Sequence, residues 1–372
     1  MRFPEFSGEW KMCTIGELIT KVGSGVTPRG GEAVYKTEGH PFVRSQNVGL
    51  GNLLLDDIAF IDEETHLRQK NTELQFNDVL LNITGASIGR SALVDKQIVG
   101  GNVNQHVCII RTKENLVPSF ICSFLLSNYG QRQIDSFQAG GNRQGLNFEQ
   151  IKSIKITIPS KDEQIKIAKL LRAIDERIAT QNKIIEKLQS LIKGLRVCCM
   201  QRNGSNNVYL SEIAQIYQPQ TISSAELTED GFLVYGANGI IGKYKDYNHK
   251  TEQICITCRG NTCGMVNYTK PMSWITGNAM VINTDKYQDK VYKKYLYHYL
   301  SAYNFNSIIS GSGQPQIVRT PLEKLKITLP TISEQKQKAM ILDKVQDKIE
   351  INHNILNLYI LQKQYLLRQM FI

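Results

Sequence analysis

Loops in both halves of the sequence carry side chains that could read the edges of DNA bases. Arg44, Arg90, Arg143 and Arg259 each lie in a segment rich in Gly, Asn and Ser. A guanidinium can donate two parallel hydrogen bonds to guanine, and an Asn or Gln amide can pair in the same way with adenine. Glycine lets the backbone of such turns approach a phosphate closely. The candidate DNA contacts are Thr27, Arg44, Asn47, Ser87, Arg90, Asn102, Asn104, Arg143, Gln144, Asn238, Lys243, Arg259, Asn261, Thr262, Asn278, Gln314 and Gln316.

The same segments have a simpler interpretation, because Gly, Asn and Ser are also the residues of ordinary turns. Repetition favours the DNA-reading interpretation. The run Gly85-Ala86-Ser87-Ile88-Gly89 is echoed by Gly260-Asn261-Thr262-Cys263-Gly264 in the second half, and Gly101-Asn102 is echoed by Gly277-Asn278. For any single loop both interpretations stay open.

The sequence offers no residue set typical of an active site or a metal centre. None of the 10 prolines is followed by another, so the tandem-proline motif of amino-methyltransferases is absent. Residues 236–244 resemble a phosphate loop, but their glycine spacing is wrong and Tyr244 stands where Ser or Thr is needed. Cys255 and Cys258 could contribute to a zinc site, but their odd spacing in a predicted strand places them on opposite faces. We therefore predict no catalytic residue, no metal and no cofactor held by this chain.

The chain contains a long internal repeat. Residues 151–178 and 322–349 align without gaps at an offset of 171, and nine of the 28 positions are identical. In both copies a proline, Pro159 or Pro330, is followed four residues later by Glu-Gln. A period of this length is too long for a solenoid and indicates a duplicated domain.

A long helix is predicted after each of these prolines. No proline interrupts residues 161–201 or 331–372, and the acids Asp162 and Glu163 suit a helix N-terminus. Apolar residues recur in alternating steps of four and three, which is typical of a coiled-coil seam. About 40 residues correspond to a helix of roughly 60 Å. The residues predicted to pair the helices are Leu171, Ile174, Ile178, Gln181, Ile185, Leu342, Val345, Ile349, Asn352 and Leu356.

The seam could pack each helix along its own globular domain, or it could join the two helices. In a head-to-tail repeat a pseudo-twofold axis is natural, and the helices would then run antiparallel. Gln181 and Asn352 are equivalent residues that interrupt the two seams near the helix midpoints. In an antiparallel pair they would fall in adjacent layers, where a polar residue commonly fixes the register at some cost in stability. We therefore predict an antiparallel coiled coil; the alternative is that each amide faces solvent.

The globular segments are predicted to be mixed domains, so the fold class is α+β with two α/β domains and a pseudo-twofold repeat. Strand-like runs at 78–84 and 253–258 end in Gly-containing turns. Short helices are expected over 118–135 and 291–310. Alternating long βα units, which would indicate a doubly wound fold, are missing. The predicted boundaries are a first domain at 1–160, a helix and linker at 161–206, a second domain at 207–330 and a final helix at 331–372.

The charge of the chain is unevenly distributed. The 372 residues include 44 Lys+Arg and 34 Asp+Glu, a net charge of +10 that allows a polyanionic partner. Residues 1–160 hold 16 of each sign, whereas 161–201 hold nine basic and five acidic residues and 331–372 hold six and four. Because more than half of the excess lies on the helices, we predict weak, salt-sensitive DNA binding by the isolated chain. With no run of 18 apolar residues and no apolar leader, we expect a cytoplasmic protein with reduced cysteines.

Four motifs, taken together, carry a family resemblance. They are the opening run Phe3–Trp10, the run Gly23–Pro28, the run Tyr235–Gly242, and the repeated Pro…Glu-Gln helix start. The whole chain resembles the specificity subunit of type I restriction–modification systems, commonly called HsdS.

This resemblance implies two target-recognition domains, each reading one half of a split DNA site. The antiparallel coil between them would set the gap between the half-sites and dock two methyltransferase subunits, and restriction/translocase subunits would join for cleavage. S-adenosylmethionine, ATP and magnesium would be used by those partner subunits. Recognition domains of the family vary greatly in sequence, so the candidate DNA contacts rest on loop chemistry alone.

We therefore predict a non-catalytic DNA-recognition and scaffold subunit. A self-contained nuclease with its own methyltransferase would need catalytic motifs that the sequence lacks. A duplicated coiled-coil scaffold protein without DNA recognition would share the repeat and the helices. A mobility-shift assay with and without the methyltransferase subunits separates that alternative from the prediction.

Overall fold

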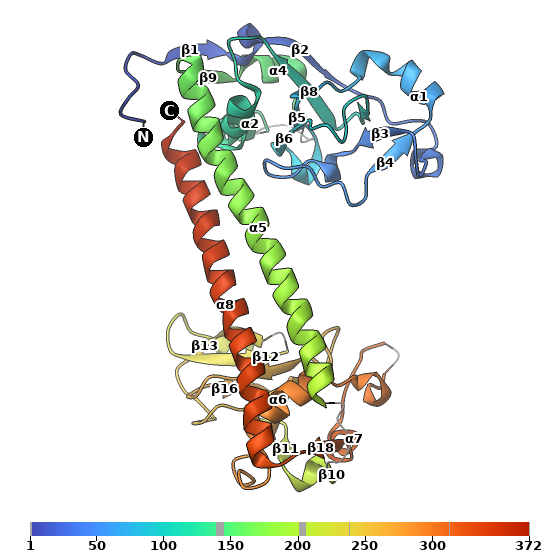
Figure 1. Ribbon diagram of the computed structural model, residues 1–372, viewed down its shortest axis with the longest axis vertical. Coiled ribbons are helices and arrows are strands. Elements are labelled where there is room, and N and C mark those ends of the chain that lie inside the picture. Colours follow the sequence, from blue (N-terminus) through green and yellow to red (C-terminus); the bar gives the residue numbers. More distant parts are fainter. Residues whose placement is uncertain (1, 139–144, 201–205, 238, 312, 372) are drawn as a thin grey trace. The chain divides into compact units, whose positions relative to one another are not determined.

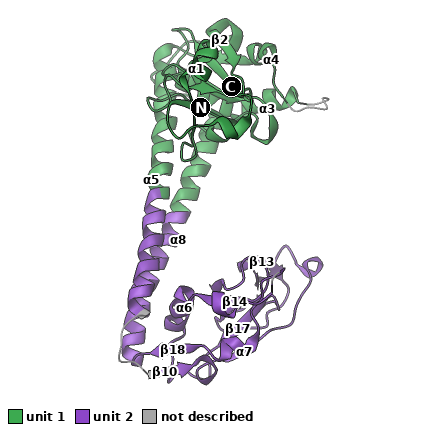
Figure 2. Ribbon diagram, turned by 90° about the vertical axis from the view of Figure 1, so that its right-hand side faces the viewer, with its two compact units in different colours: residues 1–182, 354–372 green, residues 183–353 purple. Residues whose placement is uncertain are grey.

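The computed structural model forms two compact units, which Figure 2 shows in different colours. The first unit contains residues 1–182 and 354–372, and the second contains residues 183–353. Each unit holds one globular α/β domain and a part of each long helix (Figure 1). The structure describes residues 2–138, 145–200, 206–237, 239–311 and 313–371. Of the candidate DNA contacts, Arg143, Gln144 and Asn238 lie outside the described residues.

The globular domain of the first unit contains nine strands and four short helices among its described residues. The strands are β1 (Lys11–Thr14), β2 (Ile19–Ser24), β3 (His40–Val43), β4 (Ala59–Ile61), β5 (Val79–Asn82), β6 (Ser91–Leu93), β7 (Asn102–Val103), β8 (Val107–Thr112) and β9 (Lys155–Ile158). The helices are α1 (Glu63–Arg68), α2 (Pro118–Leu126), α3 (Asn128–Ser136) and α4 (Phe148–Ser153). A central sheet has the order β2-β8-β5-β6, a small sheet has the order β4-β3-β7, and β1 pairs with β9.

The globular domain of the second unit repeats this plan. Its strands are β10 (Asn206–Tyr209), β11 (Gln215–Tyr217), β12 (Phe232–Gly236), β13 (Gly239–Tyr244), β14 (Ile254–Thr257), β15 (Val266–Tyr268), β16 (Trp274–Ile275), β17 (Ala279–Asn283) and β18 (Lys326–Leu329). Its short helices are α6 (Lys293–Ala302) and α7 (Arg319–Glu323). The central sheet has the order β11-β17-β14-β15, the small sheet has the order β13-β12-β16, and β10 pairs with β18.

The two domains share their strand register as well as their topology. An apolar row crosses each central sheet, formed by Val22, Ile110 and Val79 in the first domain and by Ile216, Ile282 and Ile254 in the second. In each small sheet the middle strand has one antiparallel and one parallel neighbour. The predicted class, a duplicated pair of mixed α/β domains, is therefore confirmed.

Both faces of each central sheet are buried. Val79 and Leu81 of β5 join the core that includes α2 and the long helices, whereas Leu80 joins the core on the opposite face. This division follows from the alternation of side chains along a strand. In the second domain Cys255 and Cys258 likewise pack into different clusters, as their odd spacing predicts.

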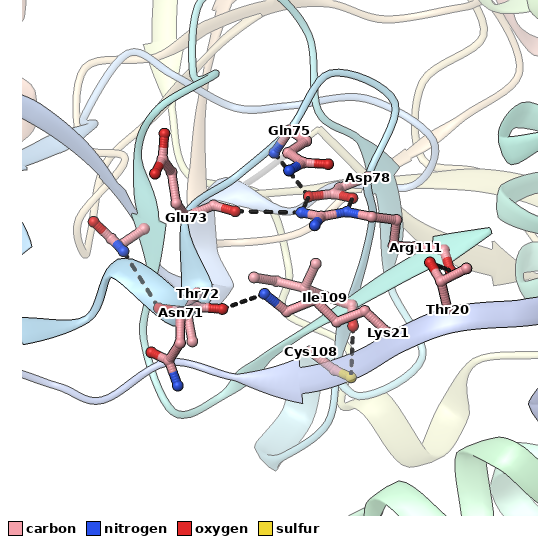
Figure 3. Close-up of polar contacts among 11 residues, drawn as sticks. Thr20, Lys21, Asn71, Thr72, Glu73, Gln75, Asp78, Cys108, Ile109 and Arg111 are labelled. Atoms are coloured by element: carbon pink, nitrogen blue, oxygen red, sulfur yellow. Dashed lines mark hydrogen bonds and ion pairs between the residues drawn. The ribbon is translucent and has the colours of Figure 1, made fainter. Parts of the chain in front are cut away.

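An ion pair joins the two inner strands of the first central sheet at one end (Figure 3). Arg111 donates from Nε and from one terminal nitrogen to the two carboxylate oxygens of Asp78, both at 2.7 Å. The same carboxylate accepts from the backbone N–H of Gln75 at 2.8 Å. The Asp78 side chain is only 1% exposed, so these three bonds satisfy a buried charge. The pair thereby joins β8 to the turn that begins β5.

The long helices are α5 (Lys161–Met200) and α8 (Ile332–Gln369), and they pair antiparallel within each unit. In the first unit Asp175 forms an ion pair with Lys363 at 2.6 Å, and Arg177 lies 5.8 Å from the ring centre of Tyr359. The later residue of α5 thus contacts the earlier residue of α8. The helices therefore run in opposite directions there, as predicted.

The second unit shows the same direction of pairing. Arg196 donates to Gln346 at 3.4 Å, and Lys338 donates to the carbonyl oxygen of Cys199 at 2.9 Å. Seam residues of the prediction that are buried are Leu171, Ile174, Gln181, Ile185, Leu342, Ile349 and Asn352. Among the described residues no helix has the length and apolarity needed to cross a membrane.

Short helices lie in both segments where the sequence predicts them, but neither segment is one continuous helix. The segment 118–135 is divided at Ser127, whose extended backbone (φ −70°, ψ 160°) ends α2. Its hydroxyl then accepts from the N–H of Gly130 and caps α3, which is a preferred use of serine. The segment expected over 291–310 is helical only to Ala302 and continues as a 3₁₀ turn at Phe305–Ile308.

The repeated glutamine at each long-helix start fixes the helix to its own domain. Gln164 accepts a hydrogen bond from the N–H of Val117, the residue before α2, at 2.9 Å. Its amide nitrogen donates to the carbonyl oxygens of Asn115 and Pro159, both at 3.1 Å. The side chain is 1% exposed, so its three bonds are made away from water.

Gln335 makes the same three bonds in the second unit. It accepts from the N–H of Tyr292, the residue before α6, at 2.8 Å. It donates to Lys290 at 3.1 Å and to Pro330 at 2.9 Å. The two contacts show that Val117 and Tyr292 are equivalent positions, which sets the register for comparing α2 with α6.

Candidate nucleic-acid interface

The candidate loops of the first domain meet at the C-terminal end of β5. The N–H of Ile83 donates to the carbonyl oxygen of His106 at 3.0 Å, and the N–H of Leu146 donates to the carbonyl oxygen of Ile83 at 2.8 Å. Thr84 and Gly145 form an isolated antiparallel bridge beside these bonds. Three loops, far apart in the sequence, are thus hydrogen-bonded side by side; we call residues 83–90, 104–106 and 145–147 the first loop edge.

The second domain repeats these three contacts at equivalent residues. The N–H of Cys258 donates to Asn278 at 3.1 Å, the N–H of Ile317 donates to Cys258 at 3.0 Å, and Arg259 and Gln316 form the bridge. The described residues 258–265, 276–278 and 313–317 form the second loop edge. The duplication therefore preserves the backbone that positions the candidate contacts.

Paired glycines shape the longest loop of each edge. Gly85 and Gly89 have φ values of 71° and 84°, and Gly260 and Gly264 have values of 86° and 91°. Glycine adopts this left-handed region without the steric cost that other residues pay. The predicted equivalence of the two glycine runs is confirmed. The glycines are explained by the backbone conformation of the turns alone, whether or not the loops bind DNA.

The second loop edge presents most of its candidate side chains to solvent. Among them Arg259 and Gln316 are neighbours across the bridge, and Gly260 donates to Pro315 at 3.0 Å. The hydroxyl of Thr262, which is half-buried, donates to Ala237 at 3.4 Å and ties the loop to the end of β12. The exposed candidates are Arg259, Asn261, Asn278, Gln314 and Gln316.

Lys243 is the remaining described candidate of the second domain. It lies on β13, and its ammonium group is 3.3 Å from Asp230. Within the second loop edge, burial raises the pKa of the Cys263 thiol, so this sulfur is kept protonated rather than nucleophilic.

In the first domain Arg90 is exposed, and Thr27 and Ser87 are half-buried. Arg44 has many protein partners. Its guanidinium donates to the carbonyl oxygen of Asp57 at 2.6 Å, lies 3.6 Å from Glu32 and stands 5.4 Å from the ring centre of Tyr35. Only 14% of the side chain is exposed. Arg44 therefore holds its loop in place in this conformation.

Three candidate asparagines of the first domain are buried. Asn47 is fully buried and donates to Leu54 at 2.8 Å, and Asn102 is fully buried and lies 2.7 Å from His66. The side chain of Asn104 accepts from the N–H of His106 at 3.0 Å. Their amides support the loops beneath the surface in this conformation.

The sequence pairing of Gly101-Asn102 with Gly277-Asn278 is wrong. Asn102 lies in β7 opposite Phe42, and the equivalent residue of the second domain is Trp274 in β16. The equivalent of Asn278 is His106. The carbonyl oxygen of each accepts a hydrogen bond from the first N–H after the central strand, which belongs to Cys258 in the second domain and to Ile83 in the first. A two-residue match is too short to align segments whose lengths differ.

The first loop edge also carries polar residues that were not among the candidates. Thr84 and His106 lie on it, with the threonine hydroxyl 2.6 Å from the imidazole Nδ1. A signal was present, because aligning Gly85 with Gly260 places Thr84 opposite Arg259.

The two edges present hydrogen-bonding groups rather than a catalytic arrangement. Within the described ranges, no three or more His, Cys, Asp or Glu side chains are grouped so that they could hold a metal ion. The exposed groups include the guanidiniums of Arg90 and Arg259 and several amides, and half-buried hydroxyls lie beside them. Such groups can distinguish bases by their donor and acceptor patterns.

The chain matches the family described as "Type I restriction modification DNA specificity domain" over residues 7–190 and 203–358. It is 25% identical over 404 residues to the type I restriction enzyme MjaVIII specificity subunit of Methanocaldococcus jannaschii, with 94% of this chain and 88% of that protein covered. It is 22% identical over 246 residues to the EcoKI specificity subunit of Escherichia coli K12, with 63% and 50% covered.

The fold is shared with a solved structure. The S subunit of a type I restriction–modification system from M. genitalium superposes with a TM-score of 0.68 at 17% identity, covering 100% of this chain and 99% of that one. Two matched family segments, each with one loop edge, and two paired long helices agree with this likeness. The chain therefore belongs to the type I restriction modification DNA specificity family, and it is a non-catalytic specificity subunit of such a system.

Proposed function

We propose that the chain reads a split DNA target, one half-site with each loop edge. Residues 1–160 and 207–330 are the proposed target-recognition domains. The observation that carries this proposal is the recurrence of three backbone contacts at both edges with different side chains on them, such as Thr84 opposite Arg259. A common frame with different hydrogen-bonding groups suits the reading of two different base sequences.

The proposed base and phosphate contacts of the second half-site are Asn238, Lys243, Arg259, Asn261, Thr262, Asn278, Gln314 and Gln316. Those of the first half-site are Thr27, Ser87, Arg90, Arg143 and Gln144. For Arg44, Asn47, Asn102 and Asn104 the proposed role is to position the loops, because their polar groups are bonded within the protein.

The paired helices are the proposed dock for two methyltransferase subunits, with restriction subunits joining the assembly. Exposed apolar side chains along these helices support this, because isolated surface helices rarely leave so many in water. They are Leu358, Ile360, Leu361 and Tyr365 in the first unit and Ile184, Leu191, Val197, Met340, Ile341 and Ile351 in the second. S-adenosylmethionine, ATP and magnesium would belong to those partners, and the site of action would be the cytoplasm, where the host DNA lies.

Mapping the methylated bases of the host genome tests the split target. The expected motif has two short specific blocks separated by a gap of fixed length and free sequence. A motif made of one continuous block would contradict two readers held apart by helices. The isolated chain should also bind DNA weakly and with strong salt dependence.

A further inference from the structure

The first unit contains a cleft where its recognition domain meets the long helices. The cleft has a volume of about 590 Å³ and lies between α2 and α5. Its wall includes Ser119, Cys122 and Ser123 from α2, Ala168 and Arg172 from α5, and Leu367 from α8. Phe76, which is 56% exposed, also lines it. An apolar floor with an exposed aromatic ring is typical of a surface that receives a partner.

The second unit shows what fills the equivalent space. The glutamine contacts make Val117 and Tyr292 equivalent, so Lys294, Tyr297 and His298 of α6 take the places of Ser119, Cys122 and Ser123. The offset of 171 between the long helices makes Asp343 equivalent to Arg172 and Arg196 equivalent to Leu367.

These five second-unit residues contact one another. Lys294 lies 2.8 Å from one carboxylate oxygen of Asp343, and Nε2 of His298 lies 2.9 Å from the other. Arg196 donates to Nδ1 of His298 at 3.2 Å and stands 5.6 Å from the ring centre of Tyr297. The imidazole is completely buried. The place that is open in the first unit is thus occupied by the chain's own aromatic and imidazole rings in the second.

The charge at the cleft is also reversed. Arg172 stands where the second unit has Asp343, and Ser119 and Ser123 of the same cleft stand where it has Lys294 and His298. Its ion pair with Glu176 joins two side chains that are 78% and 65% exposed, and such pairs stabilise little. The guanidinium is therefore free to exchange that partner for a carboxylate brought from outside.

We infer that the cleft receives an aromatic side chain and a neighbouring carboxylate of the methyltransferase subunit, which makes the two docking positions of the scaffold unequal. The aromatic ring would occupy the place of Tyr297, and the carboxylate would pair with Arg172. This inference rests on the proposed function, since it names the contact that one docked subunit makes. In the second unit this site is already filled by the chain's own Tyr297 and Asp343. Only the first unit can therefore gain these contacts from a methyltransferase subunit, so it binds its subunit more tightly.

Titration of the chain with the methyltransferase subunit of its own system tests this inference. A variant combining S119K, C122Y, S123H and R172D copies the second unit into the cleft. We expect native mass spectrometry and sedimentation to show two subunits bound to the wild-type chain with unequal affinities. In the variant the tighter of the two should weaken by at least tenfold.

The single substitution Arg172→Asp is the milder test, because this side chain is 78% exposed and its one ion pair is with an exposed carboxylate. It should weaken the tighter site in the same direction, and Arg132→Asp on α3, which is an exposed charge reversal outside the cleft, should not. Two sites of unchanged affinity in both cleft variants would overturn the inference and leave the proposed function intact. A wild-type chain that binds no methyltransferase subunit would overturn both.

Discussion

The two recognition domains share a backbone and differ in the polar groups that stabilise it. At the start of β5, Asp78 binds Arg111 of the neighbouring strand through two hydrogen bonds. At the equivalent start of β14, Gln253 donates to Asp285 at 3.0 Å, and Asp285 pairs with Lys293 at 2.6 Å. The strand register is the same in both. The two domains thus share the apolar rows and glycine turns that maintain the backbone. They differ in the charged contacts and in the side chains of the loop edges.

Breaking the polar contact at the start of the central strand should have the largest effect, and an unequal one. Asp78→Ala leaves the guanidinium of Arg111 partly buried without its partner and should cost about 3 kcal/mol of unfolding free energy. Gln253→Ala removes one hydrogen bond to the Asp285 carboxylate, which keeps its ion pair with Lys293, and should cost about 1.5 kcal/mol. Urea denaturation measures both, with the exposed Asp56→Ala as control. Equal losses would show that the two contacts are energetically equivalent after all.

Removing the repeated glutamine should have an equal effect in the two halves. Gln164→Ala and Gln335→Ala each delete three hydrogen bonds to backbone groups at the base of a long helix. We expect each to cost about 2 kcal/mol, because the freed groups are shielded from water. Chemical denaturation is the measurement, and Gln189→Ala on the exposed face of α5 is the control. A loss in only one half would contradict the common role of these residues.

Replacing the two seam amides should raise stability slightly. Gln181 and Asn352 are both buried in the seam. Changing both to Leu should add about 1 kcal/mol, or roughly 2–4 °C in melting temperature. The register of the helix pair should become less defined, which disulfide trapping between engineered seam cysteines can detect. An unchanged or lower melting temperature in the double variant would argue against their predicted placement in adjacent layers.

Mild acid should destabilise the second domain through His298, for which the first domain has Ser123. Burial lowers the pKa of His298 below 6.5, and the positive charges of Arg196 and Lys294 lower it further. The hydrogen bond that the imidazole donates to Asp343 acts in the opposite direction. The unfolded chain then binds the extra proton more readily, so the stability present above pH 6.5 is lost as the pH falls toward the folded-state pKa.

His298→Gln removes this titration while it can still donate to Asp343. Its melting temperature should fall less than that of the wild type between pH 7.5 and pH 5.5. His353→Gln on the exposed surface of α8 serves as the control. If both variants keep the acid sensitivity of the wild type, the buried imidazole is not its source.

Much of this architecture could be predicted from the sequence, because periodicity and repetition are local signals. The proline and Glu-Gln at 159–164 and 330–335 correctly placed both long helices, and the seam predicted their pairing. The glycine runs predicted the equivalent turns of the two loop edges. These features depend on residues that are close in sequence or copied at a fixed offset.

What could not be predicted depends on contacts between distant residues. Arg44 looks like a base reader until Glu32 and Asp57 are placed beside it. The break at Ser127 follows from a capping bond that competes with a continuous helix. The difference between the open cleft and its filled counterpart depends on α2, α5 and α8 meeting. The base contacts themselves depend on DNA, and they stay proposals.

Binding of the assembled complex to DNA with one altered half-site tests the central claim most directly. Arg259→Ala should weaken binding about tenfold and remove discrimination at one half-site, because a bidentate base contact is worth about 1–3 kcal/mol. Lys286→Ala, an exposed charge change at the opposite end of the second central sheet, should leave both half-sites unaffected. If Arg259→Ala reduces discrimination equally at both half-sites, each loop edge does not read its own half.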